Sequence, residues 1–351
     1  MTSIRKAPLA ARAAQAALRP RLILSDIASA LGVSRTTVSN AFNRPAQLST
    51  ALREAVLGKA RELGYFGPDP AARALRRSEV HEVGVVFHHD LRYALSDPPS
   101  IEFLRGVAQV LDARHLNLQL IPKMGRRLQL GAAFQTTADA LILHAEIDPE
   151  LAPEVLAARK PLVLVDSFVP GMTTVATQDR QGAALAMRHS LAARPDRVLV
   201  LGFPLNAPAR QRVMTQKSPP HSGYIAGERM AGYLRAARAA QFPLERISWF
   251  EVDDRQPESA ADCLGVQPRG TRLAVLAMSD RMALAALARI ATWAHVELVA
   301  LVGFDDGPAA VQAGLTTVRQ NARRKGELAV QALLDGVRPA PLPVHLVVRD
   351  T

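Results

Sequence analysis

The stretch LSDIASALGVSRTTVSNAFN, residues 24–43, decides how the first part of the chain folds. Apolar residues such as Ile27 and Leu31 recur at helical spacing, and a second helical pattern begins after Gly32. Ser34 suits the N-cap of that second helix, because its hydroxyl can accept a hydrogen bond from a free amide of the first turn. Glycine tolerates the left-handed turn between the two helices. The stretch predicts a helix-turn-helix, with a plain helical hairpin as the alternative.

The second helix of the pair has an apolar face and a polar face. The polar side chains are Arg35, Thr36, Ser39 and Asn40. In a DNA-binding helix-turn-helix, the N-terminal residues of this helix contact base edges in the major groove. A third helical pattern over residues 49–63 would close a three-helix core.

The charge of the chain is concentrated near its beginning. The net charge is +11, and residues 1–80 hold 13 Lys and Arg against 5 Asp and Glu. A basic module on a nearly neutral body is typical of proteins that bind nucleic acids. Residues 1–21 contribute to the excess: a mitochondrial presequence, a disordered basic arm and a start codon assigned too early all fit them. We favour the last two explanations.

Composition narrows the class of protein. The 351 residues are 48% hydrophobic, which is enough for two or three domains with sizeable cores. A single cysteine, Cys263, excludes an internal disulfide framework and a cysteine-rich zinc site. The sequence has no apolar run of about 20 residues and no export signal, so we expect a cytoplasmic protein without a membrane partner.

Residues 67–77, GPDPAARALRR, join the basic module to the body. Pro68 and Pro70 break a preceding helix and can open a new one. The following helical pattern is about two turns long and is marginal alone in water. We therefore expect a linker that folds only when something holds it.

From Val83 onwards, buried strands alternate with amphipathic helices, which indicates parallel sheets covered on both faces. Their number favours two doubly wound lobes with a ligand at the carboxyl ends of the strands. The predicted strands are 83–87, 118–121, 140–143, 162–166, 198–201, 247–252, 273–278 and 298–304. The predicted helices are 101–113, 153–158, 182–193, 227–239 and 281–293.

Polar residues follow several of these strands and suit a polyhydroxylated ligand. They are Ser96, Asp97, Asp166, Ser279, Asp280, Asp305 and Asp306. Some of them must instead cap helices, and Ser279 is the clearest candidate. The sequence carries no nucleotide-binding, zinc-hydrolase or nucleophile-elbow motif, so we expect no enzyme activity, no cofactor and no metal. His88 and His89 are interpreted as structural or pocket-lining.

Eight segments together resemble the lactose-repressor (LacI) family of bacterial transcription regulators, from about residue 22 to the end. They are DIASALGVSRTTVSNAFN (26–43), LSTALREAVLGKARELGY (48–65), PAARALR (70–76), EVGVVF (82–87), RMAGY (229–233), LAMSDRMALAAL (276–287), VGFDD (302–306) and LTTVRQ (315–320). The resemblance implies an all-α helix-turn-helix domain and an α/β effector domain of two lobes, similar to periplasmic binding proteins.

The resemblance also implies domain boundaries. Residues 1–21 would be a disordered basic arm, 22–66 the helix-turn-helix domain, 67–79 the hinge helix and linker, and 80–351 the effector-binding and dimerisation domain. Within the last, one lobe would comprise about 80–166 and 321–338, and the other about 167–320 and 339–351.

On the DNA side, the resemblance places Arg35, Thr36 and Asn40 at base-reading positions. Asparagine pairs best with adenine, so Asn40 suggests an operator different from that of relatives with arginine there. The remaining DNA-binding residues implied are Thr37, Ser39, Asn43, Arg53, Arg73 and Leu75. Leu75 matches the hinge leucine that wedges into the minor groove.

On the effector side, the resemblance implies contacts from Arg229, Ser279, Asp305 and Gln320, besides Ser96, Asp97 and Asp166 at the strand ends. The expected protein is a homodimeric repressor of a near-palindromic operator in double-stranded DNA, controlled by a small, carbohydrate-like effector. The alternatives are a solute-binding component of a transporter and, with less support, an enzyme on the same fold.

Overall fold

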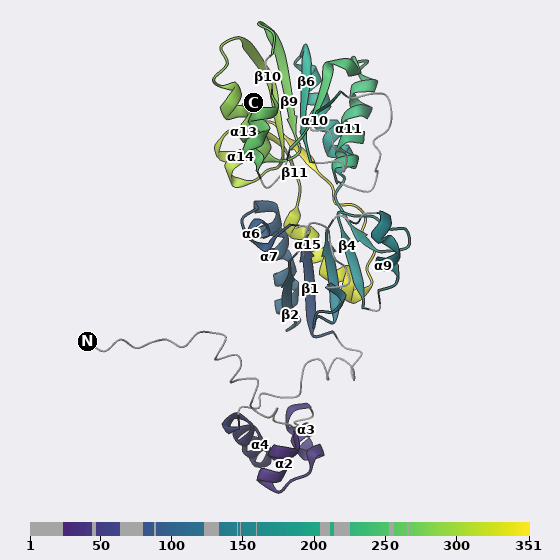
Figure 1. Cartoon of the computed structure of the whole chain (residues 1–351), viewed down its shortest axis with the longest axis vertical. Coiled ribbons are helices and arrows are strands. Elements are labelled where there is room, and N and C mark those ends of the chain that lie inside the picture. The colour runs from purple at the N-terminus through teal and green to yellow at the C-terminus, as the bar shows by residue number, and fades with distance from the viewer. Residues whose placement is uncertain are drawn as a thin grey trace, which may run out of the picture. The chain divides into compact units, whose positions relative to one another are not determined.

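The chain divides into two compact units, residues 1–79 and 80–351. The computed structural model (Figure 1) describes residues 24–43, 47–63, 80–87, 89–122, 133–145, 147, 149–158, 160–203, 211–213, 225–252, 256–264 and 267–351. The expected arm at 1–21 and the expected hinge at 67–79 therefore lie outside the described residues, as does His88.

Three helices make up the described part of the first unit, as predicted. They are α2 (Leu24–Leu31), α3 (Arg35–Asn43) and α4 (Thr50–Glu62). Ile27, Val38 and Val56, one from each helix, are fully buried against one another. The turn between α2 and α3 depends on Gly32, whose φ of 64° is left-handed. Tight burial of small apolar side chains thus fixes the angle between the two helices.

The predicted cap of α3 is confirmed. The Thr37 amide donates to Ser34 Oγ at 2.9 Å, so one of the free amides of the first turn is satisfied. Ser49 has the same relation to the Leu52 amide at the start of α4, at 3.4 Å.

The second unit contains two sheets. The first has the strand order β2-β1-β3-β4-β5, and all of its pairs are parallel. Its strands are β1 (Glu82–Phe87), β2 (Asn117–Ile121), β3 (Ala140–His144), β4 (Leu162–Val165) and β5 (Thr174–Val175). Helices α7 (Pro98–Ala113) and α15 (Ala322–Asp335) cover one face, and α9 (Ala152–Leu156) lies on the other. The short α6 (Leu91–Ala94) precedes α7.

The second sheet has the order β12-β11-β10-β9-β6-β8-β7, parallel except at its two edge strands. Its strands are β6 (Arg197–Gly202), β7 (Gln211–Val213), β8 (Ile247–Glu251), β9 (Thr271–Ala277), β10 (Val296–Asp305), β11 (Thr316–Arg319) and β12 (His345–Val347). Helices α10 (Asp179–Ala192) and α11 (Ile225–Ala239) cover one face. The other face is covered by α12 (Ala260–Cys263), α13 (Asp280–Ile290) and α14 (Pro308–Gln312).

The chain passes between the two sheets three times (Figure 1). It leaves the first sheet after β5, returns after β11 to form α15, and crosses again to reach β12. Thr177 and Leu342, on two of these crossings, form a parallel bridge. Because α15 packs on the first sheet while β11 lies in the second, the residues just before α15 connect the two lobes directly.

Two glycines let α15 approach α7 closely. A Cβ on Gly106 of α7 would lie 1.9 Å from the Arg323 carbonyl oxygen, and one on Gly326 of α15 would lie 2.1 Å from the Phe103 carbonyl oxygen. Neither backbone could tolerate a side chain at these points. This contact holds the first turn of α15, with Lys325, beside Phe103.

The predicted fold class is confirmed, and eight predicted strands are present within a few residues of their expected bounds. The prediction omitted β5, β7, β11 and β12, and the helices α6, α12, α14 and α15. The expected lobe boundary at 166/167 is wrong, because β5 pairs with β4 and keeps residues up to Val175 in the first sheet. In the described part of the chain, no helix is long and apolar enough to cross a membrane.

Candidate DNA-binding face and effector site

The DNA-binding face predicted for α3 is open in the first unit. Arg35 and Thr36 are exposed at the start of the helix, where base contacts are expected. Asn40 is half-buried, and its Nδ2 donates to Gln47 Oε1 at 3.1 Å. That hydrogen bond orients the amide, so Asn40 would have to exchange or share it to pair with a base.

The other residues expected to contact DNA differ in how exposed and how free to bind they are. The Thr37 hydroxyl lies 2.8 Å from Ser34 Oγ and belongs to the cap, while Ser39 is half-buried. Arg53 is exposed on α4, as a phosphate contact requires. Arg73, Leu75 and the side chain of Asn43 lie outside what the structure describes.

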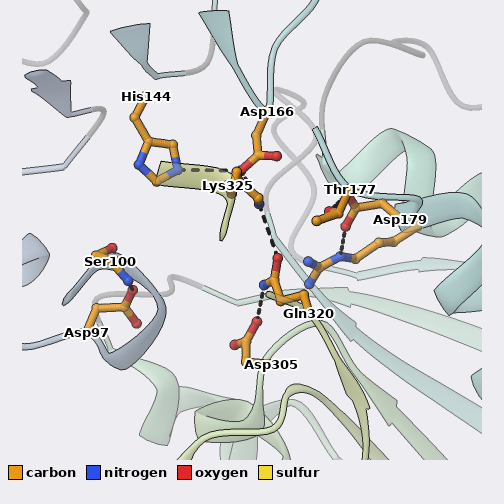
Figure 2. A network of polar contacts seen from close by, with 10 residues as sticks. Asp97, Ser100, His144, Asp166, Thr177, Asp179, Asp305, Gln320 and Lys325 are labelled. Carbon is orange, nitrogen blue, oxygen red and sulfur yellow. Dashed lines mark hydrogen bonds and ion pairs between the residues drawn. The ribbon is translucent and has the colours of Figure 1, made fainter. Parts of the chain in front are cut away.

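In the second unit, polar residues from the carboxyl ends of both sheets meet in one network (Figure 2). Lys325 Nζ on α15 donates to Asp166 Oδ2 at 2.7 Å and to Gln320 Oε1 at 3.1 Å. Gln320 Nε2 donates in turn to Asp305 Oδ1 at 2.5 Å. Asp166 follows β4 of the first sheet, and Asp305 ends β10 of the second. Three of the predicted effector residues are therefore linked, with Gln320 at the crossing between lobes.

Asp166 is buried beside two groups that stabilise its charge. Its side chain is 5% exposed, and His144 Nε2 lies 3.5 Å from the same oxygen that Lys325 contacts. Burial favours the neutral acid, but the Lys325 ammonium and the His144 ring outweigh burial and hold the pKa of Asp166 below its usual range. The Asp166 backbone is left-handed, with φ 54°, which is unusual for a residue other than glycine.

Asp305 has the opposite electrostatic environment. Burial, and then the negative charge of Asp280, raise the pKa of Asp305 well above its usual range. Burial also raises the pKa of Asp280 to about 6, although Thr317 Oγ1 and the Gly307 amide donate to its two oxygens at 2.5 and 2.8 Å. The Asp305 φ of 121° is strained for an L residue. Strain and crowded carboxyl groups at one strand end are typical of functional sites.

Arg229 lies near this site, but its guanidinium already has partners. Its Nε donates to Asp179 Oδ1 at 2.7 Å, and its Nη1 donates to the Met278 carbonyl. The guanidinium carbon also sits 3.4 Å from the centroid of the Phe304 ring. Because the side chain is only 2% exposed, any effector contact from Arg229 would have to come from its remaining N–H groups.

The other predicted effector residues act as helix caps or turn residues. Ser279 accepts from the Met282 amide at 3.3 Å and caps α13, as its position suggested. Asp97 caps α7 by accepting from the Ser100 amide and hydroxyl at 3.1 and 2.7 Å. The Ser96 hydroxyl is exposed and donates to the Tyr93 carbonyl. Asp97 also influences the network, because its negative charge contributes to the raised pKa of Asp305.

Sequence reasoning missed two residues of the network, Lys325 and His144. Lys325 lies in the run ARRKGE, where a lysine resembles an ordinary surface residue, yet it is 4% exposed. Because α15 was not among the predicted helices, no helical position indicated that Lys325 lies on a buried face. His144 is the last residue of β3, one position beyond the predicted strand. Within the described ranges, no group of three or more His, Cys, Asp or Glu could hold a metal ion.

Comparison with known protein families gives two matches. Residues 23–67 match the family described as bacterial regulatory proteins, lacI family, and residues 209–351 match the periplasmic binding protein-like domain. A curated relative from Mycobacterium tuberculosis, named as an HTH-type transcriptional regulator, is 36% identical over 351 residues. That alignment covers 95% of each chain.

Solved structures of similar fold cover most of this chain. A LacI-family transcriptional regulator from Corynebacterium glutamicum superposes with a TM-score of 0.65 at 26% identity, covering 95% of this chain and 99% of that one. The lac repressor dimer bound to operator and the anti-inducer ONPF gives a TM-score of 0.66 at 22% identity, covering 94% and 98%. The second likeness bears on the fold alone.

Proposed function

Because the chain belongs to the lacI family of bacterial regulatory proteins, and is thus a DNA-binding transcriptional regulator, we propose that it is a repressor controlled by a small sugar-like effector. The exposed start of α3 and the basic first 80 residues support DNA binding by the first unit. The linked strand ends of the two lobes support effector binding by the second.

On the DNA side, we propose a homodimer that reads a near-palindromic operator, one half-site for each α3. A palindrome follows from two-fold symmetry, because each copy presents the same helix to one half-site. A dimer bound to operator is what the solved lac repressor complex contains, and its fold matches this one. Arg35 and Thr36 would read bases first, and Asn40 would favour adenine.

On the effector side, the observation that carries the proposal is the network from Asp166 through Lys325 and Gln320 to Asp305. It joins the carboxyl ends of both sheets, where ligands bind in parallel α/β folds. A molecule that contacts both ends changes the relative free energy of different arrangements of the lobes. By linkage, the effector and the operator then change each other's affinity by the same factor.

Footprinting of the full-length protein on the DNA upstream of its own gene tests the proposal. We expect one protected near-palindrome, and we expect Arg35→Ala to lose that protection. Arg188→Ala is the matched control, because Arg188 is also an exposed arginine but lies on α10, outside the DNA-binding unit. Absence of any protected palindrome at physiological salt, with folded protein present, would reject the repressor role.

A further inference from the structure

Four exposed arginines lie where three neighbouring strands of the second sheet begin. The strands are β9, β6 and β8, which follow one another in the sheet. Arg197 opens β6, Arg246 directly precedes β8, Arg269 comes two residues before β9, and Arg194 lies in the turn between α10 and β6. This is the end of the sheet opposite to the three chain crossings (Figure 1). We call these four residues the arginine edge.

Strand pairing places the arginine edge within a short distance along the sheet. Val198 of β6 pairs with Ile247 of β8, so Arg197 and Arg246 each come one residue before a paired position. Arg197 itself pairs with Leu273 of β9. Because neighbouring strands lie about 4.8 Å apart, the starts of the three strands span about 10 Å. The backbone therefore brings positive side chains from three separate segments together.

The turn that carries Arg194 and Arg197 is held in place by Arg272. The Nε of Arg272 donates to the Arg194 carbonyl at 3.2 Å, and its Nη2 donates to the Ala193 carbonyl at 2.9 Å. The Arg272 amide donates to Asp196 Oδ2 at 2.9 Å, and the Asp196 amide donates back to the Arg272 carbonyl at 2.7 Å. These hydrogen bonds fix the backbone from which the two exposed arginines extend.

The side chains of the arginine edge have no partner in the described part of the chain. There, none of the four guanidinium groups makes an ion pair, a hydrogen bond or a ring contact. Three exposed arginines of the first lobe differ, because each pairs with an acid. These pairs are Arg105 with Glu102, Arg114 with Asp335, and Arg324 with Glu327. The arginine edge is thus a place where positive charge is gathered but not paired.

The acids beside the arginine edge do not neutralise it. Asp196 accepts from a backbone amide, and Glu297 pairs with Arg272 at 2.7 Å. Glu245 is exposed and makes no ion pair with any described residue. Like charges on neighbouring strands repel each other, and an anionic partner would relieve that repulsion. We propose that the arginine edge binds the phosphate backbone of a duplex DNA segment, separately from α3.

The residue type and the surroundings favour DNA over an acidic protein. All four cations are arginines, whose guanidinium can donate two parallel hydrogen bonds to a phosphate. A protein partner would need apolar anchors at the centre of its interface. None of the large exposed apolar side chains among the described residues lies in the segments that carry the arginine edge.

The size of the edge also suits a DNA strand. Each strand of a duplex carries one negative charge per about 3.4 Å of helix axis, so an edge of about 10 Å faces about three successive phosphates. Phosphate contacts carry no sequence information directly, so the binding is independent of sequence. A protein that binds its operator through α3 would then bind a second DNA segment through the second lobe, at the raised local concentration that tethering provides.

The test measures binding of full-length protein to a duplex that lacks the operator, by fluorescence anisotropy over a range of salt concentrations. Wild type is compared with a triple variant, Arg194→Gln, Arg197→Gln and Arg246→Gln. Each phosphate contact contributes about −0.9 to the slope of log affinity on log salt. We therefore expect the triple variant to flatten the slope by about 2 to 3 and to bind at least about tenfold more weakly at low salt.

A matched control removes the same number of positive charges from the first lobe. It carries Arg105→Gln, Arg114→Gln and Arg324→Gln, and we expect its salt slope to equal that of wild type. Thermal unfolding checks that both variants fold. The triple variant should unfold as wild type does, because its altered side chains make no contacts within the described residues. If it does not fold, the three single variants replace it, each expected to flatten the slope by about 0.9.

Operator footprinting on the same samples separates this site from the first unit. The triple variant should protect the operator as wild type does, whereas Arg35→Ala should not. Failure of the repressor role removes the footprint from wild type, whereas failure of the arginine edge leaves both the footprint and the salt slope of the triple variant unchanged.

Several results would overturn the proposal. They are equal salt slopes for wild type and the triple variant, and equal flattening by the control variant. Binding of poly-glutamate as tightly as the duplex would identify an acidic protein as the partner instead. A changed mass of the triple variant in sedimentation, with unchanged DNA affinity, would identify a contact between copies of this chain.

Discussion

Asp166 and Asp305 occupy corresponding places in the two lobes and behave in opposite ways. Each lies at the carboxyl end of a buried parallel strand, each has a positive φ, and each carboxyl is buried. Yet the pKa of Asp166 lies below its ordinary value and that of Asp305 lies well above. The difference comes from the neighbours, since Lys325 faces Asp166 and Asp280 faces Asp305.

This contrast shows that neighbouring groups, and not the position at a strand end, determine whether such a carboxyl group is charged. In the first lobe it is a charge held by a cation, which can accept hydrogen bonds at any physiological pH. In the second lobe it is a carboxyl group that burial and the charge of Asp280 make harder to ionise, so it is more readily protonated, and able to donate, than an ordinary carboxyl group. An effector that spans both ends would thus meet a fixed acceptor on one side and an adaptable group on the other.

Removing the cation from the first lobe should have the largest effect. Lys325→Met leaves the Asp166 carboxylate buried without its counter-charge, and we expect the free energy of unfolding at pH 7 to fall by about 3–5 kcal/mol. Urea denaturation measures the change. Lys160→Met removes another half-buried ammonium, which donates to two neutral carbonyls and whose pKa is lowered by burial despite the charges of Asp139 and Glu82, so its cost should be smaller, about 1–3 kcal/mol. Equal costs for the two variants would show that the ion pair adds nothing.

The pH dependence of the unfolding free energy should have opposite signs for the buried carboxyl groups of the two lobes. The folded chain keeps the Asp280 proton up to a pH of about 6, because burial raises the pKa of that carboxyl, whereas the unfolded chain loses it near pH 4. The native state binds more protons over this window, so Asp280 makes stability fall as pH rises from about 4 to 6. For Asp166 the sign is reversed: its contribution is complete above the unfolded pKa and is lost as pH falls below about 4.

Asp280→Asn should therefore flatten the pH profile. We expect the decrease in unfolding free energy between about pH 4 and 7 to shrink by on the order of 2 kcal/mol. Urea denaturation across that range measures it, and Asp335→Asn on the exposed end of α15 is the control. An unchanged slope in Asp280→Asn would mean that this carboxyl is ionised throughout.

The sequence pattern predicted both strand-end carboxylates but not the residues that face them. The runs LVLVD and LVGFD marked Asp166 and Asp305 as strand-end carboxylates, because buried parallel strands have a strong apolar signature. The pattern contains nothing about which residue will face them. Lys325 lies 159 residues from Asp166 along the chain, and only the return of α15 to the first sheet brings them together.

The elements that escaped prediction share a physical reason. β11 has the sequence TTVR and β5 is two residues long, so neither gives an apolar run. The first turn of α15 carries three consecutive basic residues and a glycine, which conceal the apolar residues further along the helix. Arg229 gives a related case: the sequence predicted an effector contact there, and its ion pair with Asp179 had no sequence signal because the two residues lie 50 positions apart.

A smaller effect of opposite sign is expected at Asp305. Asp305→Asn removes a carboxyl crowded by Asp280, while the amide oxygen can still accept from Gln320 Nε2. We expect the free energy of unfolding at pH 7 to stay unchanged or to rise by up to about 1 kcal/mol, since the variant removes a buried carboxyl group whose ionisation is opposed by burial and by the charge of Asp280. Asp166→Asn, which leaves Lys325 without a counter-charge, should lower it. If both variants lower stability equally in urea denaturation, the two carboxyl groups have the same electrostatic role.

The smallest effect should come from a second ion pair on the same helix. Arg114 contacts Asp335 through two hydrogen bonds of 2.7 and 2.6 Å, but the two side chains are 38% and 40% exposed. Water screens such a pair, so Arg114→Met should cost less than about 1 kcal/mol, and raising salt from about 0.1 to 1 M should remove the cost. The cost of Lys325→Met should survive the same change in urea denaturation, because ions cannot enter the space between Lys325 and Asp166. Helix α15 thus carries both ion pairs, and salt dependence separates the pair that fastens its exposed end from the pair that shapes the effector site.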